Sequence, residues 1–159
     1  MTIPGLEAVW IETKIDQNVL LVGSLYRPPS SPVSYWKLIE DSIKKAVNSP
    51  HRFIVLGDFN DDPWNNPSPH LLKIIEENNL FQLIDEPTRI TSTTSRCIDL
   101  IFTNNRDLVD SVSVRPPIGS DHCITGVKLK SRTMTNRYIN KKSHEFFEVR
   151  CQQISTGAW

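Results

Sequence analysis

An acidic residue inside an apolar run is the strongest constraint on this chain. Asp99 lies within Cys-Ile-Asp-Leu-Ile-Phe at 97–102, a pattern typical of a buried or half-buried strand. A buried carboxylate without a partner costs several kcal/mol or takes up a proton. Among the four histidines, His122 is the natural partner, because it follows Asp121 in the polar turn at 118–123. A carboxylate bonded to one imidazole nitrogen raises the basicity of the other. The alternative places Asp99 on an exposed strand face.

The remaining apolar runs predict an α/β protein with a mixed sheet. Two of them, at 6–15 and 19–26, are separated by three polar residues and favour a β-hairpin. Helical spacing predicts helices over 34–47 and 68–79, the second with Ser68 as N-cap and Pro69 at its first position. The polar run 88–96 is expected to be a loop. Further strands are predicted at 53–56, 81–84, 97–102, 108–114 and 123–129.

Length and charge divide the chain unequally. Its 159 residues suit one modest core, which we expect over residues 1–129. That part carries 12 Lys and Arg against 16 Asp and Glu, a net −4, whereas residues 130–159 carry 6 against 2, a net +4. The final segment is expected to be a basic linker with a possible short helix at 144–154. It would serve either as a weak basic arm or as a solvated tail.

Cysteine use and hydropathy point to a soluble intracellular protein. The three cysteines have no C-x-x-C spacing, so neither a disulfide framework nor a zinc site is indicated. No stretch of about 18 apolar residues could span a membrane. The N-terminal residues lack the basic and apolar regions of a signal peptide. We therefore expect no membrane partner.

Polar residues after the run at 53–56 add to the candidate site. In Gly57-Asp58-Phe59-Asn60, extended geometry would place Asp58 and Asn60 on one side and Phe59 on the other. An ordinary turn is the alternative. The next two residues, Asp61 and Asp62, continue the acidic run and are expected to be solvated loop charge rather than ligands. Carboxylates together with a histidine suit metal-assisted attack on a phosphate ester.

Four motifs stand out along the chain: Tyr-Arg-Pro-Pro at 26–29, Gly-Asp-Phe-Asn at 57–60, Ile-Asp-Leu-Ile-Phe at 98–102 and Ser-Asp-His at 120–122. Together they resemble the endonuclease/exonuclease/phosphatase superfamily, whose members include DNase I-like and apurinic endonucleases. More narrowly, the Tyr-Arg-Pro-Pro form, Pro-Thr-Arg at 87–89 and Asp-Leu-Ile-Phe-Thr-Asn at 99–104 resemble the endonuclease domain of non-LTR (LINE-type, jockey-like) retrotransposons. The resemblance covers residues 6–129.

The resemblance implies a partial four-layer α/β sandwich and cleavage of DNA phosphodiester bonds with Mg²⁺ or Mn²⁺. It implies that Asp58 activates the attacking water or assists the leaving group, and that Asn60 orients it. Asp99 would hold His122, which would contact the scissile phosphate.

Three further roles follow from the same resemblance. Asp121 would help to bind the metal, and carboxylate oxygen is the right chemistry for a hard cation. Tyr26 would contact the phosphate, although simple packing is its alternative, and Ser120 would assist in substrate binding. DNA is the implied partner, no stable protein partner is indicated, and a nuclear location is compatible with the family.

The chain also departs from the family pattern. Family members begin with a strand that bears an Asn, then a helix and a Glu that is the main metal ligand, and nothing before Leu6 supplies these. We therefore expect the C-terminal part of such a domain, with weak metal binding and slow cleavage. An apolar face that includes Trp10, Leu20 and Val22 should be poorly covered. The alternatives are an inactive mobile-element remnant that acts at most as a binding module, or a phosphatase of the same superfamily.

Overall fold

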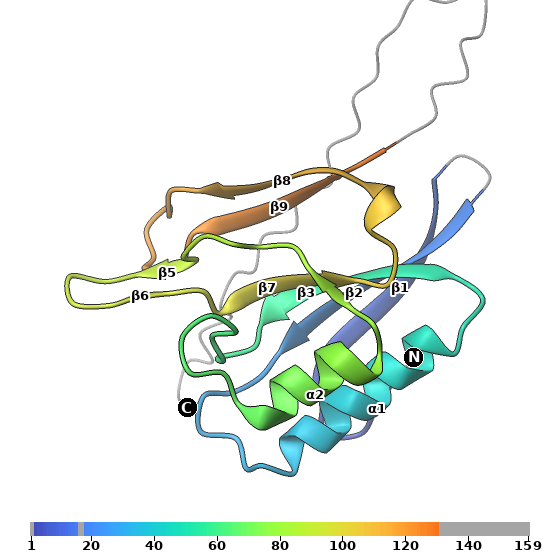
Figure 1. Cartoon of the computed structure of the whole chain (residues 1–159), viewed down its shortest axis with the longest axis horizontal. Coiled ribbons are helices and arrows are strands. Elements are labelled where there is room, and N and C mark those ends of the chain that lie inside the picture. The colour runs from blue at the N-terminus through green and yellow to red at the C-terminus, as the bar shows by residue number, and fades with distance from the viewer. Residues whose placement is uncertain (1, 16–17, 131–159) are drawn as a thin grey trace, which may run out of the picture.

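A five-stranded mixed sheet forms the centre of the computed structural model, which describes residues 2–15 and 18–130 (Figure 1). Its strand order is β1-β2-β3-β7-β4, in which β2 and β3 run parallel and the other neighbours antiparallel. The hairpin and the mixed sheet predicted from the sequence are confirmed. The strands are β1 (Glu7–Ile15), β2 (Asn18–Tyr26), β3 (Arg52–Asp58), β4 (Phe81–Gln82) and β7 (Asp99–Thr103).

Two helices cover one face of this sheet (Figure 1). They are α1 (Tyr35–Val47) and α2 (Pro69–Glu77). Ser68 caps α2 as predicted, because its side chain accepts a hydrogen bond from the backbone nitrogen of Leu71. Ser34 precedes α1, but its side chain makes no capping hydrogen bond. At 13 and 9 residues, both α-helices of the described chain are too short to cross a lipid bilayer.

A two-stranded ribbon lies over the other face of the sheet, so the molecule has three layers (Figure 1). The ribbon pairs β8 (Val109–Arg115) with β9 (Ile124–Leu129), and a short 3₁₀ helix, η1 (Arg106–Leu108), leads into it. Between the sheet and β9 lies a cavity of about 90 Å³, lined by apolar side chains of both layers such as Leu56 and Val127. This arrangement agrees with a partial α/β sandwich.

Two details of the expected fold were wrong. The run 88–96 is not a loop but a second, short ribbon, formed by β5 (Arg89–Ile90) and β6 (Ser95–Arg96). Its strands are too short to produce an alternation that sequence reasoning could detect. The strand expected at 81–84 is present as β4 but spans only Phe81–Gln82, after which Leu83 N still donates to Ile101 O of β7. The tail, including the expected helix at 144–154, lies outside the described residues.

The sheet does have exposed apolar side chains, but they are not the residues that were predicted. Trp10 faces the helices, where its Nε1 donates to Ser42 Oγ at 2.9 Å and its ring meets Phe53 edge-on. Leu20 is buried and Val22 is half-buried. The exposed members of the face are Val9, 64% exposed, and Ile11, 55% exposed, on the edge strand β1.

Candidate active site

Strand register brings three predicted site residues side by side. Tyr26 pairs with Asp58 between β2 and β3, and Asp58 pairs with Asp99 between β3 and β7. Residues paired across neighbouring strands point to the same face of a sheet. All three lie at a strand end, since Tyr26 and Asp58 finish their strands and Asp99 begins its own. The three residues therefore form a row at one end of the inner strands β2, β3 and β7.

The predicted contact between Asp99 and His122 is present. His122 Nδ1 lies 2.9 Å from Asp99 Oδ2 and 3.2 Å from Asp99 Oδ1. One ligand atom each of Asp58, Asp99 and His122 lies within 4.8 Å of the others. With a proton on Nδ1, the imidazole donates to Asp99 and its Nε2 can accept from water or approach a phosphate.

Thr88 holds this pair together and was not among the predicted site residues. It is fully buried, and its Oγ1 accepts hydrogen bonds from the backbone nitrogens of Ile98 and Asp99 at 3.0 and 2.8 Å. Its hydroxyl also acts to lower the pKa of Asp99, against the effect of burial. On the other side, Cys123 N donates to Thr88 O. The signal for Thr88 was the Pro-Thr-Arg motif, whose polar surroundings favoured a loop.

Burial dominates the electrostatics of the cluster. It raises the pKa of Asp58 to about 6, an effect that the neighbouring charge of Asp99 increases and the hydrogen bond from Asn60 N opposes. Burial also raises the pKa of Asp99, against the pull of His122. The pKa of Tyr26 is raised by burial and then by Asp58. A carboxyl group with a pKa near neutrality can exchange a proton at physiological pH.

The raised pKa of Asp58 predicts a pH-dependent stability. A carboxyl group whose pKa rises from 3.8 to about 6 on folding stabilises the fold while protonated. This contribution is present below about pH 4 and is lost as the pH rises through about 6. In metal-free buffer, Asp58→Asn should therefore gain about 1–3 kcal/mol relative to wild type between pH 4 and pH 7.

Urea denaturation at several pH values, with EDTA present, measures this difference. Asp107→Asn, at an exposed carboxyl group in η1, is the matched control and should follow the wild type. A gap between Asp58→Asn and wild type that stays constant with pH would refute the prediction.

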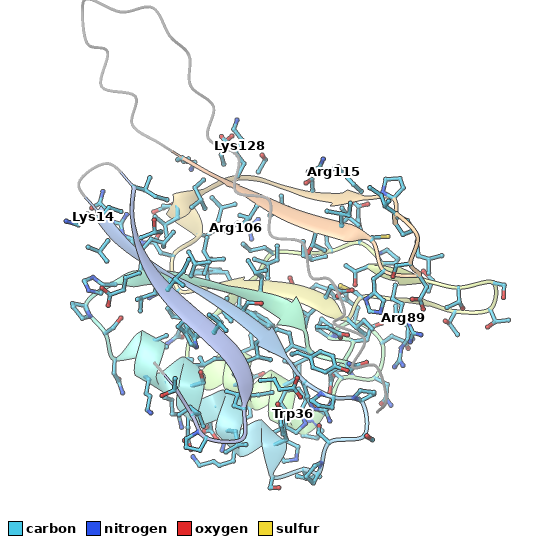
Figure 2. The ribbon with its side chains drawn as sticks, turned by 180° about the vertical axis from the view of Figure 1, so that it is seen from behind. Lys14, Trp36, Arg89, Arg106, Arg115 and Lys128 are labelled. Carbon is cyan, nitrogen blue, oxygen red and sulfur yellow. The ribbon has the colours of Figure 1, made fainter. Side chains whose placement is uncertain are left out.

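The other predicted site residues are tied to their own loops. Asn60 Nδ2 donates to Arg27 O at 2.9 Å, and Ser120 Oγ accepts from His122 N at 3.1 Å. Arg89 Nε donates to Asp121 Oδ2 at 2.7 Å, and this bond holds the pKa of Asp121 below its usual value. Figure 2 shows Arg89 at the base of the β5–β6 ribbon. Asp121 is not part of the 4.8 Å cluster, and its role as metal ligand stays a prediction.

Asp62 corrects a further expectation. The acidic pair after Asn60 was expected to be solvated loop charge, but Asp62 is 4% exposed. Its carboxylate accepts hydrogen bonds from the backbone nitrogens of Trp64, Asn65 and Cys97. It therefore fixes the loop after β3 against the start of β7.

Comparison with known proteins shows which family the chain belongs to. The model of the endonuclease/exonuclease/phosphatase family matches residues 5–122. The chain belongs to this family. The matched region of this family member contains the whole carboxylate–histidine cluster. Asp58 and Asp99 lie inside the region, and His122 is its last residue.

Solved structures similar to this family member share its fold. The endonuclease domain of TRAS1, a telomere-specific non-LTR retrotransposon, is 24% identical with a TM-score of 0.62, over 73% of this chain and 58% of that one. A family protein from Leptotrichia buccalis is 22% identical with a TM-score of 0.60, over 77% and 53%. A mannosyl-6-phosphatase from Bacteroides thetaiotaomicron is 18% identical with a TM-score of 0.53, over 72% and 52%.

The match covers only part of those structures. The chain spans between 52% and 58% of their length. A search of curated proteins gave no match.

Proposed function

We propose that this chain cleaves phosphodiester bonds of DNA with the cluster at the end of β2, β3 and β7. The observation that carries the proposal is the hydrogen bond between Asp99 and His122, with the carboxylate of Asp58 beside it. An imidazole oriented by a buried carboxylate, next to a second carboxylate of raised pKa, is an arrangement suited to proton transfer. The motif resemblance to retrotransposon endonucleases and the similarity to the TRAS1 endonuclease fold support DNA as the substrate.

The proposed roles follow the geometry. Asp99 fixes the imidazole of His122, so that Nε2 contacts a phosphate oxygen. Asp58 accepts or donates the proton that moves between water and leaving group. Tyr26, from the same row of the sheet, contacts the phosphate. Asn60 orients the attacking water, and Ser120 supports the loop that carries His122.

Enzymes of this family are generally metal-dependent, and the donor set fits a hard cation. The carboxylates of Asp58 and Asp99 offer oxygen ligands within one cluster, and oxygen is what Mg²⁺ and Mn²⁺ prefer. We propose that Asp58 holds the ion together with Asp121. When bound, the ion stabilises the negative charge that develops on the phosphate.

We also propose that the chain is one part of a larger domain of this family. Val9 and Ile11 leave an apolar part of the sheet exposed, and the similar structures contain much chain that has no counterpart here. The motifs also lack the Glu that is the family's main metal ligand. We therefore expect slow cleavage and weak metal binding by this chain alone.

Nicking of supercoiled plasmid in Mg²⁺ or Mn²⁺, compared with phosphate release from a sugar monophosphate, tests the substrate class. We expect slow nicking that EDTA abolishes, and no release of phosphate. Release from the monophosphate alone would instead favour a phosphatase, a candidate supported by the fold of the mannosyl-6-phosphatase. A folded chain that hydrolyses neither substrate would overturn the proposal in favour of an inactive binding module.

A further inference from the structure

Arg27, from the Tyr-Arg-Pro-Pro motif, bonds repeatedly to the segment that carries Asp58 and Asn60. Its backbone nitrogen donates to Asp58 O at 2.8 Å, and its carbonyl oxygen accepts from Asn60 Nδ2 at 2.9 Å. Its Nη1 donates to Phe59 O at 3.3 Å and to Asn60 O at 3.4 Å. Four hydrogen bonds of one residue thus reach three consecutive residues of the candidate site.

An aromatic ring holds the Arg27 side chain in place. The guanidinium carbon lies 4.5 Å from the ring centroid of Trp36, a buried residue of α1. Trp36 stacks in turn on the ring of His70, with 6.4 Å between centroids and 20° between planes. Figure 2 shows Trp36 on the helix side of the sheet. Nε of Arg27 is buried without a hydrogen-bond partner among the residues that the structure describes. Contact with the indole face is therefore a main constraint on the guanidinium.

The turn that Arg27 contacts departs from the strand conformation of β3. Asn60 has a φ of 46°, in the left-handed region that asparagine adopts more readily than other residues with a side chain. The pairing of β2 with β3 ends at Tyr26 and Asp58, so it does not reach Phe59 or Asn60. Arg27 supplies contacts to both residues beyond the end of the strand.

We infer that Arg27 is a positioning residue, braced by Trp36, that sets the turn from Asp58 to Asn60 in its working orientation. Asn60 N donates to Asp58 Oδ1, so a shift of Asn60 also turns the Asp58 carboxylate. Lysine cannot substitute fully, because its ammonium lacks the planar, delocalised face that stacks on the Trp36 ring while Nη1 donates to both carbonyl oxygens. The effect on rate rests on the proposed function, but the effect on the turn does not.

Arg27→Met tests the inference with two independent readouts, and Arg27→Lys is the conservative variant. The first readout is the ¹⁵N-¹H spectrum of the Asn60 backbone and side-chain amides. The second is kcat and KM for plasmid nicking. We expect Arg27→Met to move both Asn60 signals and to lower kcat by about tenfold or more with little change in KM. Arg27→Lys should give an intermediate shift and partial rescue.

Trp10→Phe is the matched control. The side chain of Trp10 also packs between the sheet and α1, yet it contacts Ser42 and Phe53, away from the turn. Trp10→Phe should lower the stability of the chain while leaving the Asn60 signals and kcat as in the wild type.

Asn60 signals unchanged in both Arg27 variants would overturn the inference, as would a loss of kcat no larger than that of Trp10→Phe. If wild type does not nick DNA, the proposed function fails, and the Asn60 signals still decide the role of Arg27. Should Arg27→Met not fold, Arg27→Lys decides by the same two readouts.

Discussion

Gly57→Ala is expected to destabilise the chain by more than about 3 kcal/mol, because the added methyl group has no space. A Cβ at this position would lie 1.7 Å from Leu25 O and 2.7 Å from the carbonyl carbon of Leu25. Both atoms are backbone of β2, which pairs in register with β3 at this point. Relief therefore requires separation of two central strands beside Tyr26 and Asp58. Domains of this size are stable by only about 5–15 kcal/mol, so the loss is a large fraction of the total.

Urea denaturation followed by circular dichroism measures this loss. Gly119→Ala is the control, because Gly119 also has a positive φ, of 69°, but nothing lies within 4 Å of its added Cβ. That variant should lose only about 1 kcal/mol, the cost of a left-handed backbone for alanine. Equal losses in the two variants would show that backbone conformation, rather than the approach of Leu25, makes Gly57 necessary.

The larger elements of the fold were predictable because each has a local signal. Alternation and the polar break at 16–18 gave the first hairpin, and the Ser68-Pro69 pair gave the start of α2. The β5–β6 ribbon had no such signal, because strands of two residues show no period. Alternation also shows which residues share a face but not which face meets the helices. Trp10 was therefore assigned to the wrong side of the sheet.

The pairing of Asp99 with His122 was predictable for a different reason. A carboxylate in an apolar strand requires a partner, and a chain with four histidines offers few. The row of Tyr26, Asp58 and Asp99 depends on strand register, which sequence alone does not fix. Asp62 was missed for a similar reason, since one of its three donors, the backbone nitrogen of Cys97, lies 35 residues away in the chain.

His122→Ala is expected to have the largest effect on activity. The imidazole is the group that Asp99 and Thr88 are arranged to hold, and Nε2 is the nitrogen left for the phosphate or water. Loss of a positioned acid or base lowers hydrolysis by about 10²–10⁴-fold. Because His122 is half-buried at the end of the sheet, its removal should leave the fold intact. His51→Ala, just before β3 and at the opposite end of that strand from Asp58, should nick DNA like the wild type.

Nicking of supercoiled plasmid by wild type, His122→Ala and His51→Ala, in Mg²⁺ and with matched circular dichroism spectra, tests the central claim most directly. The account predicts slow, EDTA-sensitive nicking by wild type and His51→Ala, and none above background by His122→Ala. Nicking by His122→Ala at a rate close to wild type would contradict it, because the reaction would then not depend on the Asp99–His122 pair.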